Sequence, residues 1–120
     1  MVVDFSGRTT GRRYSIPLSA HQIDGTIYAM TSAPWKLNFR GGVPAQVLHN
    51  RESIAMRGEL IEDSSIVGDL AHRCAQAYGA RRAHAMMGLK FRDGQIPAAK
   101  DFAAVCEREQ YFAVRFTPAE

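Results

Sequence analysis

The stretch YSIPLSAHQIDGTIYAM, from Tyr14 to Met30, decides the fold class of this chain. Up to His21 it alternates apolar and polar residues, which is the pattern of a half-buried β-strand. Pro17 cannot donate to a sheet ladder, so this strand is expected at a sheet edge or with a bulge there. Asp24-Gly25 is a frequent hairpin turn, and the residues after it are β-prone again. The stretch therefore predicts an antiparallel hairpin.

Residues on both sides of this hairpin continue the strand pattern through the first half of the chain. Val2–Phe5 is a short β-prone run, and the polar turn Arg8–Arg13 follows it. Residues 33–40, after the hairpin, are expected to form one or two helical turns that end at Gly41-Gly42. A second hairpin is expected from two β-prone runs around a polar turn: Ala45–His49, Asn50-Arg51-Glu52 and Ile54–Ile61.

The second half of the chain changes to a helical period. Apolar residues recur at helical spacing from Val67 to Tyr78, with Ser64 or Ser65 as the N-cap and Gly79 as the stop. Residues 80–87 are expected to form a second, shorter helix.

The chain is expected to end with a helix and a strand. Pro97 is expected to open a third helix with a buried stripe of Phe102, Val105 and Cys106. Alternating residues from Tyr111 to Phe116 then predict a closing strand. The order of elements predicts an α+β protein, an antiparallel sheet with helices packed on it.

The composition is that of a folded domain. The chain has 120 residues, of which 46% are hydrophobic and 22% charged, and this length suits one domain over residues 1–120. No stretch approaches the roughly 20 apolar residues of a membrane span, and Met1–Phe5 lacks the features of a signal peptide. Cys74 and Cys106 are too few for a disulfide framework or a zinc site. We therefore expect a reduced, cytoplasmic protein.

The formal net charge of +3 lies entirely in the first half of the chain. Residues 61–120 carry as many acidic as basic side chains, whereas the segment from Arg8 to Arg51 is basic with Asp24 as its single acid. Basic residues among Gly and Thr favour a phosphate or carboxylate partner. A solvated basic surface without a ligand is the alternative.

No motif for nucleophilic or metal chemistry stands out in the sequence. Cys74 lies on the apolar stripe of a helix, where a thiol acts as a small hydrophobe, and His72 faces another side of that helix. G-x-S-x-G, P-loop and G-x-G-x-x-G patterns are not found. The four histidines have no metal-ligand spacing: His21, His49, His72 and His84.

Two segments of the basic half carry candidate binding residues. Thr9-Thr10-Gly11-Arg12-Arg13 offers hydroxyls, a permissive backbone and two guanidinium groups, which together suit an oxyanion. The segment from Thr31 to Arg40 offers a serine near a helix start, a tryptophan, an amide and two cations. Taken singly, each also fits a structural interpretation: a polar hairpin turn, and a short helix whose Trp35 fills the core.

Taken together, the two segments resemble a known family. Thr9–Arg13 followed by Pro17-Leu18, and then Trp35-x-x-Asn38-Phe39-Arg40, is similar to the deazaflavin-dependent nitroreductase family. That family belongs to the flavin-binding split β-barrel group, which includes pyridoxamine-phosphate-oxidase-like proteins. The resemblance covers roughly residues 3–62. It implies a mostly antiparallel split β-barrel with short helices packed on it.

The resemblance also implies the site residues. The turn near the cofactor phosphate matches Thr9, Thr10, Gly11, Arg12 and Arg13, and the loop and short helix beside the cofactor match Ser32, Trp35, Asn38 and Arg40. Ser32 would be the catalytic donor beside the reacting ring, and Tyr111 is a candidate for the substrate side. The stretch from Gly11 to Pro17 is shorter than in the family, and Ala33 stands where a cofactor-contacting lysine is common.

What the resemblance implies is an oxidoreductase. It would use 8-hydroxy-5-deazaflavin (coenzyme F-420), or alternatively FMN or FAD, to reduce a small-molecule acceptor such as a quinone or nitro compound. The cofactor carries such chemistry, while the protein binds, orients and excludes water. No nucleic acid and no membrane span are expected as part of this function, and a homodimer is left open. Two alternatives remain: a non-catalytic split barrel that carries a flavin, haem or other flat ligand, and a basic nucleic-acid-binding module.

Overall fold

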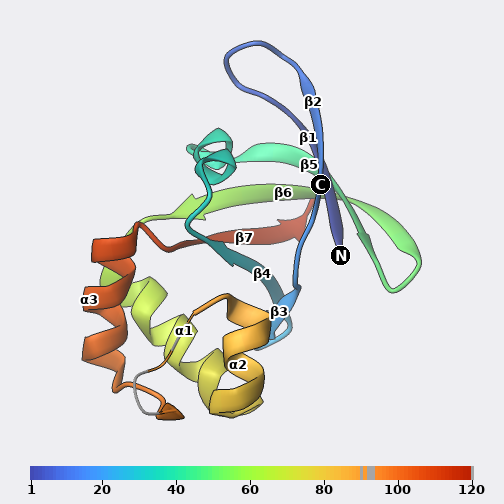
Figure 1. Cartoon of the computed structure of the whole chain (residues 1–120). Coiled ribbons are helices and arrows are strands. Elements are labelled where there is room, and N and C mark those ends of the chain that lie inside the picture. The colour runs from blue at the N-terminus through green and yellow to red at the C-terminus, as the bar shows by residue number, and fades with distance from the viewer. Residues whose placement is uncertain (90, 92–93, 120) are drawn as a thin grey trace. The chain divides into compact units, whose positions relative to one another are not determined.

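The computed structural model describes residues 1–89, 91 and 94–119 of the chain (Figure 1). Strands dominate the first half and helices the second. The elements follow one another as β1 (Val2–Ser6), β2 (Arg13–Pro17), β3 (His21–Ile23), β4 (Thr26–Thr31), the 3-10 helix η1 (Pro34–Phe39), β5 (Val43–His49), β6 (Glu52–Ile61), α1 (Ser64–Tyr78), α2 (Ala80–Met87), α3 (Ala99–Glu109) and β7 (Phe112–Pro118).

The strands form a 7-stranded antiparallel sheet that curls into a half-barrel. Its order is β2-β1-β5-β6-β7-β4-β3, so β2 and β3 are the two edge strands. The hairpin turn between β3 and β4 has positive φ angles at both Asp24 (51°) and Gly25 (79°), as a two-residue turn of the I′ type requires. The expected α+β class, a mostly antiparallel barrel-like sheet with short helices, is confirmed.

The expected strand from Tyr14 to His21 is wrong as a single element. The chain forms β2 up to Pro17 and starts β3 at His21, and these two strands lie at opposite edges of the sheet. Pro17 pairs with Val2 at the end of β2, where its missing N–H group disturbs no further pairing. The alternation of residues 14–21 therefore spans two short strands, which periodicity alone cannot separate.

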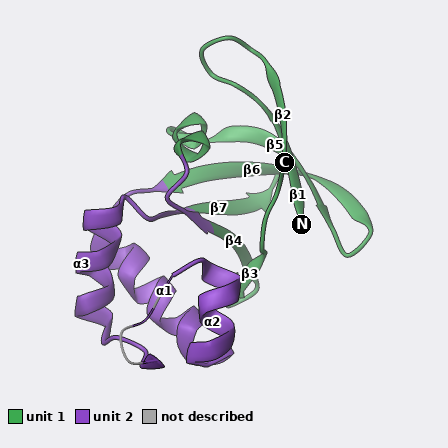
Figure 2. Ribbon diagram, in the orientation of Figure 1, with its two compact units in different colours: residues 1–29, 34–60, 114–120 green, residues 30–33, 61–113 purple. Residues whose placement is uncertain are grey.

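The chain divides into two compact units (Figure 2). Unit 1 comprises Met1–Ala29, Pro34–Leu60 and Val114–Glu120, and unit 2 comprises Met30–Ala33 and Ile61–Ala113. The core of unit 1 is built from side chains that alternate along the strands, so that Val3 of β1 and Val47 of β5 are paired and both fully buried. Phe39 of η1 and Phe116 of β7 complete this core.

Among the described residues, the α-helices α1, α2 and α3 belong to unit 2. The N-cap of α1 is Asp63 and not one of the two serines that the sequence suggested, because its carboxylate accepts from the backbone N–H groups of both Ser65 and Ile66. The expected bounds of α2 are confirmed, whereas α3 begins at Ala99, after the expected opening at Pro97. Within the described residues, no helix has the length and hydrophobicity of a membrane span.

Candidate functional site

The turn between β1 and β2 is held by its own backbone. The N–H group of Gly7 donates to the carbonyl of Arg12 at 2.7 Å, and the N–H group of Gly11 donates back to the carbonyl of Gly7 at 2.9 Å. The N–H group of Arg12 donates to Oγ1 of Thr10 at 3.3 Å. These three backbone donors are used inside the turn and are not available to an anion.

The side chains of the turn point into solvent. Thr9, Thr10, Gly11, Arg12 and Arg13 are all exposed. Gly11 has a φ of 70°, a left-handed conformation that glycine adopts without strain. Hydroxyl and guanidinium groups at an exposed tip are available to a ligand.

Asn38 joins the turn to η1. Its Oδ1 accepts from the backbone N–H group of Arg8 at 3.0 Å, across 30 residues of sequence, and its Nδ2 donates to the carbonyl of Trp35 at 2.8 Å. The two segments that the sequence singled out are therefore neighbours within unit 1. Both polar atoms of Asn38 have protein partners, so this side chain is a positioning residue between the turn and the helix.

Trp35 lies at the margin of an aromatic cluster. Its ring centroid is 6.0 Å from that of Phe5 and 6.0 Å from that of Phe39. Phe5 also stacks on Tyr14, its partner on β2, at 5.4 Å. Since Phe5 and Phe39 are buried whereas Trp35 and Tyr14 are partly exposed, the cluster leads from the core to the surface.

Arg12 and Arg13 point to different faces of the hairpin. The guanidinium carbon of Arg12 is 5.8 Å from the ring centroid of Tyr14, on the side of the aromatic cluster. Arg13 pairs with Ser6 across the strands, and its Nη1 donates to Oγ of that serine at 3.4 Å. Arg12 is therefore the arginine placed beside the aromatic rings.

Gly7 is a residue of this site that the sequence motifs did not single out. A Cβ atom on Gly7 would lie 2.8 Å from Cε2 of Tyr14, too close for ordinary contact. The glycine therefore permits the Tyr14 ring to cover the start of the turn. The contact joins Gly7, just after β1, to Tyr14 of β2, seven residues later, and a single sequence carries no signal for it.

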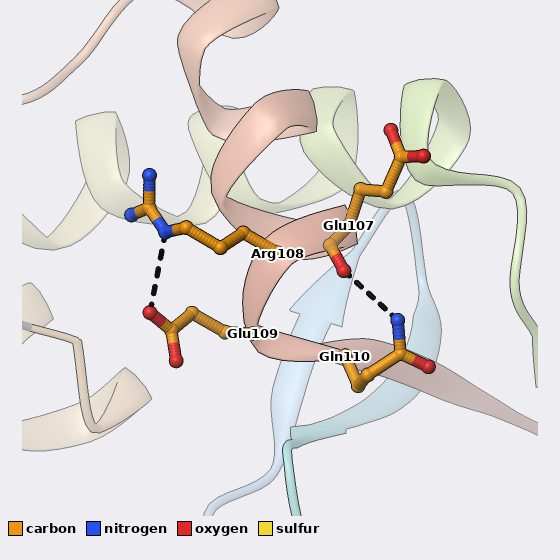
Figure 3. A network of polar contacts seen from close by, with 4 residues as sticks. All are labelled: Glu107, Arg108, Glu109 and Gln110. Atoms are coloured by element: carbon orange, nitrogen blue, oxygen red, sulfur yellow. Dashed lines mark hydrogen bonds and ion pairs between the residues drawn. The ribbon is translucent and has the colours of Figure 1, made fainter.

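Ser32 and Arg40 lie outside this group. Ser32 belongs to unit 2, where it lines a cavity of about 270 Å³ together with Gly88, Leu89, Val105, Arg108 and Glu109. At this cavity Nε of Arg108 is 3.4 Å from Oε1 of Glu109, and the neighbouring Gln110 donates from Nε2 to the carbonyl of Glu107 at 2.9 Å (Figure 3). Arg40 belongs to unit 1 and is exposed directly after η1.

Two cysteines and a tyrosine of unit 2 are buried in its core. Cys74 and Cys106 are free and buried, and burial raises the pKa of each thiol to about 11. The hydroxyl of Tyr111 donates to the carbonyl of Met87 at 2.9 Å, and this side chain is 2% exposed. Tyr111 is therefore a core residue of unit 2. Among the described residues, no group of three His, Cys, Asp or Glu side chains could hold a metal ion.

Comparisons with known proteins identify no relative of this chain. No protein-family model, curated protein sequence or solved structure matches the chain. Its candidate site therefore consists of the basic turn, the Asn38 bridge and the Trp35 aromatic cluster, all within unit 1.

Proposed function

We propose that unit 1 binds the phosphate-bearing part of a deazaflavin, coenzyme F-420, with FMN or FAD as the alternatives, and that the protein is a reductase of small molecules. The observation that carries this proposal is the Asn38 bridge, because it holds a cationic turn beside a partly exposed tryptophan. A phosphate needs donors and positive charge, and a flat ring system needs an aromatic or apolar wall. Both requirements are met by neighbouring residues here.

The donor set of the turn fits an anionic group. Thr9, Thr10 and Arg12 are exposed, and no acidic residue among the described ones forms an ion pair with Arg12. The N–H groups of Gly11 and Arg12 bond inside the turn, and the exposed hydroxyl and guanidinium groups would do the binding. Arg12 would make the direct contact because it lies on the aromatic side, and Arg13 would act at longer range.

The protein's part in the reaction would be binding, orientation and exclusion of water. A reduced deazaflavin supplies a hydride to electron-poor acceptors such as quinones and nitro compounds. Trp35 would cover one side of the bound ring, and Asn38 would keep the turn and η1 at a fixed separation.

The test is a calorimetric titration of the purified protein with coenzyme F-420, FMN and FAD, followed by reduction assays with menadione and nitrofurazone. We expect saturable binding of one cofactor and consumption of its reduced form only when protein and acceptor are both present. Binding without turnover would leave a ligand carrier and would exclude the reductase. Binding of haem or of single-stranded RNA in place of all three cofactors would overturn the proposal.

A further inference from the structure

Unit 1 contains a cavity of its own. Its volume is about 380 Å³, within the range of small-molecule sites, and β1, β2, β5 and β6 contribute to its walls. Asp4, Ser6 and Arg13 line it on one side. The rest of its wall is mostly apolar and includes Pro44, Ala55, Met56 and Ala119. None of the residues assigned to the cofactor, apart from Arg13, belongs to it.

One carboxylate oxygen of Asp4 has no hydrogen-bond partner among the described residues. Asp4 is in the middle of β1 and is paired on both sides, with Ser15 of β2 and Gln46 of β5. Its Oδ1 is buried and accepts no hydrogen bond from the described residues. The neighbouring amide of Gln46 donates instead to Oγ of Ser53 at 2.9 Å. A buried carboxylate oxygen without a donor is costly, so it favours a ligand that brings one.

Arg13 supplies the opposite charge at the same cavity. It is diagonal to Asp4 across the β1–β2 ladder, and such positions have Cβ atoms roughly 7–8 Å apart. Its guanidinium makes one long hydrogen bond, 3.4 Å to Ser6, and no ion pair joins it to Asp4 among the described residues. The cavity thus presents a negative and a positive charge that form no ion pair with each other, together with an apolar lining.

We propose that this cavity binds a small zwitterion, an amino acid whose ammonium and carboxylate groups are separated by a short aliphatic chain. The ammonium group donates to Asp4, and the carboxylate accepts from Arg13. The terminal torsion of an aspartate is broad, so either of its oxygens can turn toward the ammonium group. The methylene groups lie against Pro44 and Ala55. A ligand with only a positive charge would meet Arg13, and a ligand with only a negative charge would meet Asp4. A zwitterion can place each of its charges beside the opposite one.

The test follows backbone amide shifts by NMR during titration with 4-aminobutyrate, n-butylamine and butyrate. We expect 4-aminobutyrate to shift β1 and β5 amides saturably with a dissociation constant of about 1 mM or tighter, and the other two probes to bind at least tenfold more weakly. Asp4→Asn should weaken 4-aminobutyrate binding tenfold or more without lowering the melting temperature. Glu52→Gln, which neutralises an exposed carboxylate outside the cavity, is the matched control and should bind like the unmodified protein.

Three outcomes would overturn this proposal. One is equal binding of butylamine and 4-aminobutyrate, and another is full binding by the Asp4→Asn variant. The third is a concentration-dependent dimer in sedimentation that Asp4→Asn dissociates, because a second copy of the chain would then be what satisfies Asp4. Asp4 has no part in the turn or the aromatic cluster, so the Asp4→Asn result distinguishes failure of this proposal from failure of the cofactor proposal.

Discussion

Replacing Asn38 by alanine removes a side chain that links the basic turn to η1. Two hydrogen bonds are lost, at 3.0 Å to the Arg8 N–H group and at 2.8 Å to the Trp35 carbonyl. Hydrogen bonds contribute roughly 0.5–1.5 kcal/mol each, and water can reach the exposed Arg8 N–H group, so we expect a loss of about 1–2 kcal/mol in the free energy of unfolding. For a chain of this size the melting temperature should fall by about 4–8 °C.

The same change should weaken cofactor binding more than it weakens the fold. Without the bridge, the turn leaves its position beside Trp35 for part of the time. If the turn occupies the bound position about a tenth of the time, the apparent affinity falls about tenfold. Urea unfolding followed by circular dichroism measures the first effect, and calorimetric titration with coenzyme F-420 measures the second.

The control for this experiment is Gln22→Ala. Gln22 is an exposed amide on β3 whose side chain makes no hydrogen bond among the described residues, so its loss should change neither quantity. Equal stability and equal affinity of Asn38→Ala and the unmodified protein would refute the bridging role. A loss of stability with unchanged affinity would show that the Asn38 hydrogen bonds stabilise the fold but do not contribute to cofactor binding.

Three other perturbations address the turn, the core of unit 1 and the core of unit 2. Arg12→Ala should weaken coenzyme F-420 binding about tenfold in calorimetry and Arg13→Ala less, with the smaller effect disappearing at high salt; the reverse order would contradict the assignment of Arg12. Burial lowers the pKa of His21 below its ordinary 6.5. As the pH falls, this side chain is therefore protonated in the unfolded state at a higher pH than in the folded state. The free energy of unfolding should therefore decrease as the pH falls below 6.5 toward the folded-state pKa, and His21→Gln should flatten this slope in urea titrations. Cys74 and Cys106, with pKa values raised to about 11, should react with a thiol reagent at pH 8 at least about 100-fold faster after unfolding; fast labelling of the native protein would contradict their burial.

Local patterns predicted most of the elements because the forces that form them act over a few residues. The Asp24-Gly25 turn and the bounds of α2 follow from backbone preferences and apolar spacing. The N-cap of α1 was missed because Asp63 competes with two serines one and two positions later, and its carboxylate accepts two backbone hydrogen bonds. Such a choice depends on the geometry of the first turn, which residue types alone leave undecided.

The candidate site was less predictable because its contacts are long-range. The sequence shows that hydroxyl and guanidinium groups are concentrated in residues 9–13. It does not show that the N–H groups of Gly11 and Arg12 form hydrogen bonds inside the turn. The Asn38–Arg8 bond joins positions 30 residues apart, and the unpartnered Asp4 depends on where Gln46 directs its amide. No periodicity reports such pairings.

The proposal that the cofactor binds beside Trp35 is best tested by adding coenzyme F-420 to the protein and following its intrinsic fluorescence. Trp35 is the only tryptophan, so its emission reports on one place, beside the turn that Asn38 holds. We expect saturable quenching of this emission at one cofactor per chain, with an affinity about tenfold weaker in Arg12→Ala. Unchanged emission at cofactor concentrations that saturate the calorimetric signal would contradict it, because the cofactor would then bind away from Trp35 and the aromatic cluster would be core packing alone.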